Sequence, residues 1–127
     1  MPMRLSIEAR DEYLRFEVTG ERVRGETVPE AVRMWSLVAE ECRATGLDRV
    51  LGVNRVTGKP VTLEMFQISS RLPAILAGAV RKVAFVIVGD QELVRASLFA
   101  ENVAVNRGLN GRVFEDEVRA LAWLLER

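Results

Sequence analysis

Residues 82–88, with the sequence KVAFVIV, decide the fold class of this chain. Six apolar residues follow Lys82 without a polar interruption. A strand with one solvated face would alternate between apolar and polar residues, so a short continuous run indicates a strand covered on both faces. Such strands are typical of parallel sheets that are flanked by helices. We therefore predict that Val83 to Val88 forms a central strand buried on both faces.

Helical and strand patterns alternate along the rest of the chain. The other predicted strands are residues 5–9, 14–18, 49–56 and 112–114, and the predicted helices are residues 27–45, 62–76, 91–107 and 117–125. The first two strands flank a polar turn at residues 10–12 and read as a β-hairpin. Pro73 is expected to kink or restart the second helix. No linker, low-complexity stretch or internal repeat divides the sequence.

Several helix ends carry recognisable signals. Thr27 and Glu30 have the spacing of a capping box at the start of the first helix. Asp90 and Asp116 are placed to cap the third and last helices. The last helix is expected to bury a stripe of apolar residues, with Trp123 packed beside it. That stripe is Val118, Leu121, Ala122 and Leu125.

These elements predict one α/β domain over residues 1–127. We expect a mostly parallel five-stranded sheet, an antiparallel strand supplied by the N-terminal hairpin, and about four helices. A chain of 127 residues buries roughly two-thirds of the surface that it exposes when unfolded. The length is therefore sufficient for a single hydrophobic core.

Composition argues against several classes of function. Eighteen basic residues balance eighteen acidic ones, which disfavours nucleic-acid binding. No apolar run is long enough to span a membrane. The chain has no histidine and a single cysteine, Cys42, so a Cys/His metal site or a histidine-activated nucleophile cannot be assembled within it. We expect a cytoplasmic protein that is not an enzyme, has no cofactor, and holds Cys42 as a buried inert thiol.

The loop GVNRVTGKPVT, residues 52–62, superficially resembles a phosphate-binding loop. A Walker A loop has four residues between its glycines and a Ser or Thr after its lysine. Here five residues separate Gly52 from Gly58, and Pro60 follows Lys59. Proline also removes a backbone N–H from a site that binds phosphate through backbone amides. We therefore expect no nucleotide binding at this loop.

The C-terminal third carries a resemblance to a known family. Its motifs are NRGLN at Asn106–Asn110, RVF at Arg112–Phe114 and ALAWL at Ala120–Leu124, after the KVAFVIV strand. These residues resemble the small bacterial STAS/SEC14-like, or SpoIIAA-like, domains. The resemblance implies a SpoIIAA-like fold of successive strand–helix turns over the whole chain.

The resemblance also draws attention to the loop after the third strand. In anti-sigma-antagonist members this loop carries an Asp-Ser-Ser-Gly motif whose serine is phosphorylated. This chain lacks the motif, so the phosphoserine switch does not carry over. Thr57, Gly58, Lys59 and Thr62 form the candidate regulatory loop. Thr62 lies nearest the phosphoacceptor position, and we favour for it the role of a helix N-cap.

Two helices have more apolar residues than one core-facing stripe needs. On the second helix Leu63 and Phe66 point away from the stripe, and on the third Val94 and Leu98 do so. These four residues are the candidate interface, for a second copy first, another protein second and a lipid-like ligand third. The leading functional hypothesis is a non-catalytic, STAS-like interaction or regulatory module that acts through helical surfaces. The alternative is a small carrier or sensor of an apolar ligand, as in SEC14-like domains.

Overall fold

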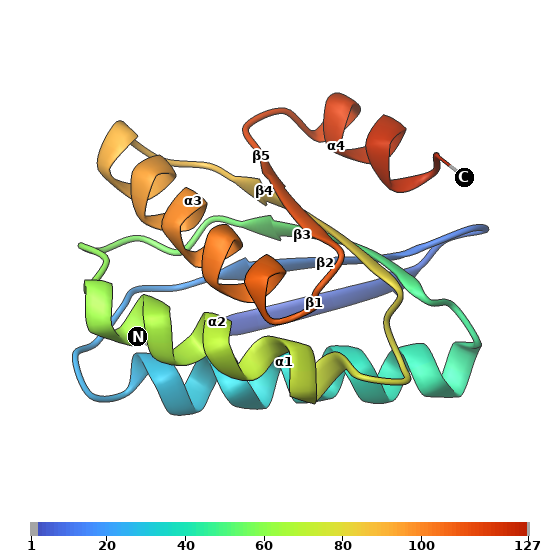
Figure 1. Ribbon diagram of the computed structural model, residues 1–127, viewed down its shortest axis with the longest axis horizontal. Coiled ribbons are helices and arrows are strands. Elements are labelled where there is room, and N and C mark those ends of the chain that lie inside the picture. Colours follow the sequence, from blue (N-terminus) through green and yellow to red (C-terminus); the bar gives the residue numbers. More distant parts are fainter. Residues whose placement is uncertain (1–2, 127) are drawn as a thin grey trace.

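Five strands lie side by side in the order in which they occur in the chain (Figure 1). The computed structural model describes residues 3–126. Its strands are β1 (Arg4–Ala9), β2 (Leu14–Thr19), β3 (Arg49–Asn54), β4 (Lys82–Ile87) and β5 (Gly111–Phe114). Its helices are α1 (Thr27–Thr45), α2 (Thr62–Leu76), α3 (Gln91–Asn106) and α4 (Glu117–Leu124).

The sheet is mixed in the way the sequence predicts. β1 pairs with β2 in antiparallel register, and the pairs β2–β3, β3–β4 and β4–β5 are parallel. Each parallel pair is joined by one helix, as parallel strands require. The prediction of an α/β fold with a largely parallel five-stranded sheet and an antiparallel hairpin strand is confirmed.

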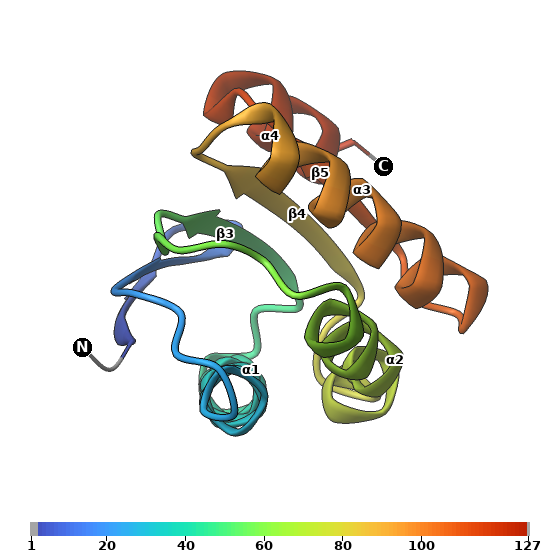
Figure 2. The ribbon, with the colours of Figure 1, turned by 90° about the vertical axis from the view of Figure 1, so that its left-hand side faces the viewer.

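The helices cover the two faces of the sheet unequally. Crossovers of one hand bring α1, α2 and α3 to the same face, where α2 packs between α1 and α3 (Figures 1 and 2). The main core lies between these helices and the sheet and includes Phe16, Trp35 and Leu76. α4 packs on the opposite face over β3, β4 and β5, where Ala120 and Leu124 complete a second core.

β4 is an interior strand with both faces covered. Val83, Ala84, Val86 and Ile87 are at most 3% exposed, and β3 and β5 pair with its two edges. Phe85 is only partly buried, and the prediction fails at its last residue, because Val88 is 43% exposed. The strand ends at Ile87, and Val88 is already part of the turn that leads to α3.

The start of α1 differs from the predicted capping box. The N-cap is Glu26 and makes no side-chain capping bond. The Thr27 hydroxyl donates instead to the carbonyl oxygen of Val23 at 3.1 Å, and Thr27 is buried. A Glu30 carboxylate oxygen accepts a hydrogen bond from the backbone N–H of Met3 at 2.7 Å. The Glu30 carboxylate, which the capping-box pattern assigns to the start of the helix, therefore binds Met3 instead.

The two aspartate caps are confirmed. Asp90 accepts from the backbone N–H of Leu93 at 3.0 Å, and Asp116 accepts from that of Val118 at 2.9 Å. The predicted stripe of α4 is wrong, because Val118 is 77% exposed and Ala122 is also exposed.

The side of α4 that faces the sheet is a helical stripe of four residues, one of which is a glutamate. It consists of Glu117, Ala120, Leu121 and Leu124, at i, i+3, i+4 and i+7. The first position of this stripe is charged. A prediction that looks only for apolar residues therefore places the buried face of α4 on the wrong side of the helix. Trp123 is half-buried, with its ring centroid 5.7 Å from that of Phe114.

Candidate functional site

The β3–α2 loop is tied to the preceding connection by backbone hydrogen bonds. The Thr57 N–H donates to the Gly20 carbonyl oxygen at 2.9 Å, and the Arg22 N–H donates to the Thr57 carbonyl oxygen at 2.9 Å. The Thr57 hydroxyl also donates to the Gly20 oxygen, at 3.1 Å. Thr57 is therefore part of a short parallel bridge between two loops at the carboxyl ends of β2 and β3.

The Arg22 side chain reinforces the same loop. Its Nη1 lies 3.2 Å from the carbonyl oxygen of Val56, 3.4 Å from that of Thr57 and 3.0 Å from that of Gly58. Burial lowers the pKa of the Arg22 guanidinium, and the nearby Glu64 carboxylate opposes this shift. Gly58 adopts a φ of 97°, and a β-carbon there would lie 3.3 Å from both the Cβ and the backbone N of Arg22. Arg22 and Gly58 together fix the path of the loop.

The other two residues of the candidate regulatory loop are more open. Lys59 Nζ lies 4.0 Å from a Glu92 carboxylate oxygen, and both side chains are largely exposed, so this pair contributes little. Thr62 is exposed and is the first residue of α2. The predicted N-cap role of Thr62 is wrong, because the N-cap is Val61, which offers no side-chain acceptor.

Three of the four candidate interface residues are exposed. Leu63 is 64% exposed, Phe66 38% and Leu98 44%. Val94 is the exception at 7%, because α3 turns it toward Ile87 and Leu93 over the end of β4. The prediction that Val94 lies on the outer face of α3 is therefore wrong.

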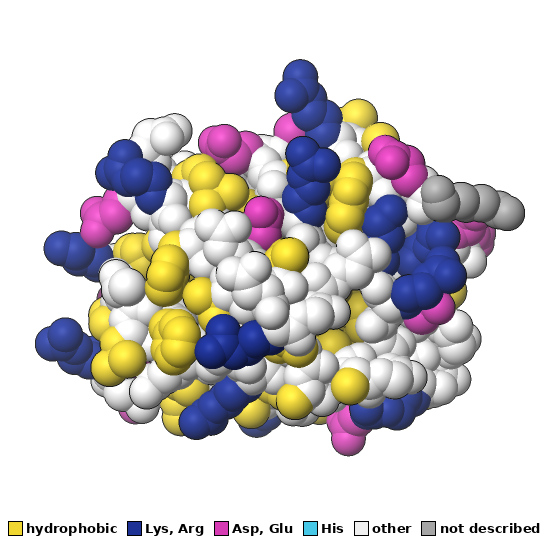
Figure 3. All heavy atoms as spheres, in the orientation of Figure 1, with side chains coloured by type: hydrophobic (Ala, Val, Ile, Leu, Met, Phe, Trp, Pro, Cys, Tyr) yellow, Lys and Arg dark blue, Asp and Glu magenta, His cyan; other side chains and the backbone are white. Residues whose placement is uncertain are grey.

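Two more residues of α3, Phe99 and Val105, are also exposed apolar side chains, at 40% and 44%. We call the combined surface the α2–α3 patch, and it consists of Leu63, Phe66, Leu98, Phe99 and Val105. Figure 3 shows hydrophobic side chains gathered over the start of α2 and the adjoining α3. The Arg107 guanidinium lies 5.4 Å from the centroid of the Phe66 ring, which links the two helices at this surface.

A cavity of about 130 Å³ lies between the sheet and helices α1, α2 and α3. Most of its lining is apolar and includes Trp35, Leu72 and Phe85. Arg22 lines it from the β2–α1 connection, and Glu101 from α3. The cavity therefore combines an apolar body with a few charged groups, which is the usual composition of a small-ligand site.

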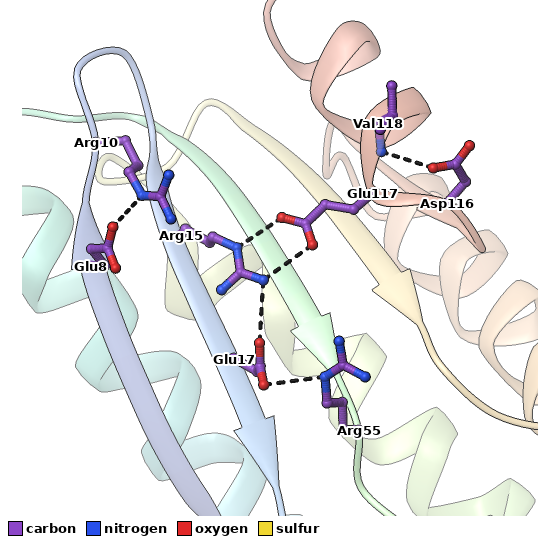
Figure 4. A network of polar contacts seen from close by, with 8 residues as sticks. All are labelled: Glu8, Arg10, Arg15, Glu17, Arg55, Asp116, Glu117 and Val118. Carbon is purple, nitrogen blue, oxygen red and sulfur yellow. Dashed lines mark hydrogen bonds and ion pairs between the residues drawn. The ribbon is translucent and has the colours of Figure 1, made fainter.

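An ionic network lies on the opposite face of the sheet, beside α4 (Figure 4). Arg15 binds Glu117 through two hydrogen bonds of 2.8 and 3.1 Å and also contacts Glu17 at 3.2 Å. Glu17 in turn accepts from Arg55 at 3.2 Å. The hydrogen bonds from Arg15 lower the pKa of Glu117, and the same contacts raise that of Arg15. The network joins α4 to β2, so its first role is structural.

The described part of the chain offers little for other chemistries. Within residues 3–126, no three side chains among His, Cys, Asp and Glu lie together in a way that could hold a metal ion. No helix in that range has the length and apolar character needed to cross a bilayer. Burial raises the pKa of Cys42 to about 11, and the thiol is 2% exposed.

Comparison with known proteins adds no assignment. No protein-family model, no curated protein and no solved structure matches the chain.

The sequence gives little warning of Arg22 and of the cavity. Arg22 belongs to the charged connection GERVRG, in which no spacing distinguishes it from Arg24. Its position depends on the parallel pairing of β2 with β3, which brings residues 34 to 36 positions apart into contact. A local pattern cannot show a contact of that range.

Proposed function

We propose that the protein is a non-catalytic interaction or regulatory module that associates with a second copy of itself through the α2–α3 patch. The observation that carries the proposal is the presence of five exposed apolar side chains on two helices that pack against each other. Isolated exposed apolar residues are ordinary on a protein surface, whereas several of them on two neighbouring helices give those helices apolar area that a partner could cover.

Charge favours a second copy as the occupant. The chain has a formal net charge of zero, so two copies do not repel each other through a large like charge. Exposed charges of both signs also lie on or next to these two helices. They include the basic residues Arg71 and Arg107 and the acidic residue Glu92. An isologous contact pairs a surface with itself, so charges of both signs on that surface can pair across the two-fold axis.

The resemblance to STAS domains supports a regulatory role for this surface. The exposed Thr62 directly precedes Leu63, so the candidate regulatory loop runs into the patch. A partner bound at the patch would therefore contact the end of the loop. In this proposal the module acts in the cytoplasm, where a free thiol such as Cys42 is stable.

The test is the oligomeric state of a doubly charged variant. Phe66→Glu combined with Leu98→Glu places two carboxylates in the patch without touching a buried side chain. We expect the wild type to be a dimer by light scattering at micromolar concentration and the variant to be a folded monomer. The matched control is Val118→Glu, since Val118 is exposed on α4 at the opposite face. A monomeric wild type, or a variant that remains dimeric, would contradict the proposal.

A second proposal, a sensor or carrier of a small apolar molecule, is favoured by the cavity. Its volume of about 130 Å³ is close to that of an engineered apolar cavity of about 150 Å³ that binds benzene. Pockets for drug-sized ligands are larger, about 300–1,000 Å³. The cavity therefore favours a ligand the size of a single ring over a long-chain lipid.

A further inference from the structure

The Arg22 guanidinium has hydrogen-bonding capacity that the protein leaves free. A guanidinium carries five N–H donors on three nitrogens. All three protein acceptors of Arg22 bind to Nη1, and within residues 3–126 neither Nε nor Nη2 has an acceptor. Arg22 also forms no ion pair in that range, since Glu64 accepts from the backbone N–H of Gly25 at 3.1 Å instead.

This guanidinium is held in place before any ligand arrives. The carbonyl oxygens of Val56, Thr57 and Gly58 fix Nη1, and the Arg22 backbone is itself bonded to Thr57. Arg22 is half-buried, which removes part of the hydration of its guanidinium and lowers its pKa. A fixed and partly desolvated cation binds a carboxylate more strongly than a mobile surface arginine does, because less side-chain entropy is lost on binding.

The surroundings of Arg22 define the rest of the ligand. Arg22 lines the cavity together with Val18 and Asn54, which lie at the carboxyl ends of β2 and β3. The Asn54 Oδ1 already accepts from the Val56 N–H at 2.9 Å. Beyond these residues the lining is mainly apolar, with Phe85 and Leu72 among its members.

From this arrangement we infer that the cavity binds a small amphiphilic monocarboxylate, with the carboxylate on Nε and Nη2 of Arg22 and an aromatic or branched hydrocarbon body in the apolar space. The inference rests on the second proposal above and specifies its ligand. Glu101 of α3 and Arg112 of β5 also line the cavity. The Glu101 carboxylate accepts from the Val113 N–H at 2.6 Å and would repel an anion placed beside it.

The test compares two probes of nearly the same shape, benzoate and benzamide, which differ in charge. Binding is followed by NMR titration of the Arg22 Nε–H and of methyl groups that line the cavity. We expect benzoate to bind at least tenfold more tightly than benzamide, since a charge-assisted bidentate pair is roughly twice as strong as neutral hydrogen bonds. Arg22→Gln is expected to remove this preference, whereas the control Arg24→Gln, at an exposed arginine two residues away, is expected to keep it.

Each outcome separates the inference from the proposal on which it rests. Equal affinity of the wild type for the two probes, with both lost when Ala100→Leu fills the cavity, would overturn the carboxylate and keep an apolar ligand site. Binding of neither probe at millimolar concentration would overturn both. The ratio of the wild-type affinities for benzoate and benzamide tests the carboxylate site even if Arg22→Gln fails to fold.

Discussion

The ring of Phe16 covers the backbone of Gly52 so closely that a β-carbon at position 52 would lie 2.3 Å from the Phe16 Cζ atom. The parallel register places Gly52 between Phe16 on β2 and Phe85 on β4. Trp35 of α1 completes the group. The centroid of its ring lies 5.0 Å from that of Phe16 and 5.5 Å from that of Phe85. A side chain is missing at the centre of the sheet so that three aromatic rings can meet there.

Gly52→Ala is therefore expected to destabilise the protein. A new methyl group forces Phe16 and Phe85 from their positions, and overpacking of a core typically costs about 1–3 kcal/mol. Alanine would otherwise be favoured over glycine within a strand, so the predicted sign is opposite to the usual preference. Urea denaturation of the two proteins measures the difference.

The double variant Gly52→Ala with Phe16→Leu isolates the contact between these residues. Removing the ring makes room for the methyl group, so the combined loss is expected to be smaller than the sum of the single losses. Strict additivity would show that the two side chains do not compete for space.

Leu124→Ala tests the orientation of α4. Leu124 is fully buried, and the loss of a buried leucine typically costs about 2–5 kcal/mol. Val118→Ala on the same helix is the matched control, because Val118 is largely exposed and a surface change of this kind usually stays within about 0.5 kcal/mol. Thermal unfolding of both variants gives the comparison. Equal losses would mean that the helix is rotated.

Glu117→Gln is expected to lower stability by about 0.5–1 kcal/mol at neutral pH, because the pair with Arg15 is partly exposed and screened by water and salt. The hydrogen bonds from Arg15 hold the pKa of Glu117 below its ordinary value. A carboxyl with a lowered folded-state pKa stabilises the fold above its unfolded pKa, which is about 4.3. That contribution disappears as the pH falls through the folded-state pKa.

The difference between wild type and Glu117→Gln should consequently shrink in acid. Urea denaturation at pH 7 and near pH 3 measures it, with Glu115→Gln as a control on a neighbouring exposed carboxylate. A difference that does not depend on pH would assign the loss to packing.

Cys42 is expected to resist alkylation in the folded protein. Its pKa is raised to about 11 from a reference of 9.0, mainly by burial, so the reactive thiolate is scarce at neutral pH. Iodoacetamide should label the unfolded chain near pH 9 and the native chain only near pH 11. Since the folded-state pKa is the higher one, the thiol stabilises the fold below pH 9 and loses this effect as the pH rises to 11. Rapid labelling of native protein at pH 8 would contradict the assignment.

The sequence predicts the fold well because its strongest signals are local. The run KVAFVIV identifies an interior strand, and Asp90 and Asp116 cap helices through N–H groups two or three residues away. These signals need no knowledge of the rest of the molecule. They are sufficient to give the order of elements and the largely parallel sheet.

Several of the errors occur where a distant residue takes over a local role. Glu30 matches a capping box but binds the backbone of Met3, and Glu117 lies on the buried stripe of α4 because Arg15 of β2 pairs with it. Val94 lies off the expected stripe of α3 and is buried because the end of β4 reaches it. The Arg22 site depends on contacts across the sheet, so periodicity along the chain could not reveal it.

The sequential order of the five strands also bears on how the chain folds during synthesis. Each new strand that leaves the ribosome finds its partner at the edge of the sheet already formed, so no later strand has to be inserted between two earlier ones. The second face is protected only at the end. Its apolar residues on β3 and β4, among them Leu51 and Val86, have no cover until α4 has emerged. A nascent chain that pauses before residue 117 would hold a nearly complete sheet with one bare apolar face, and exposed apolar surface of this kind makes a folding intermediate prone to aggregation.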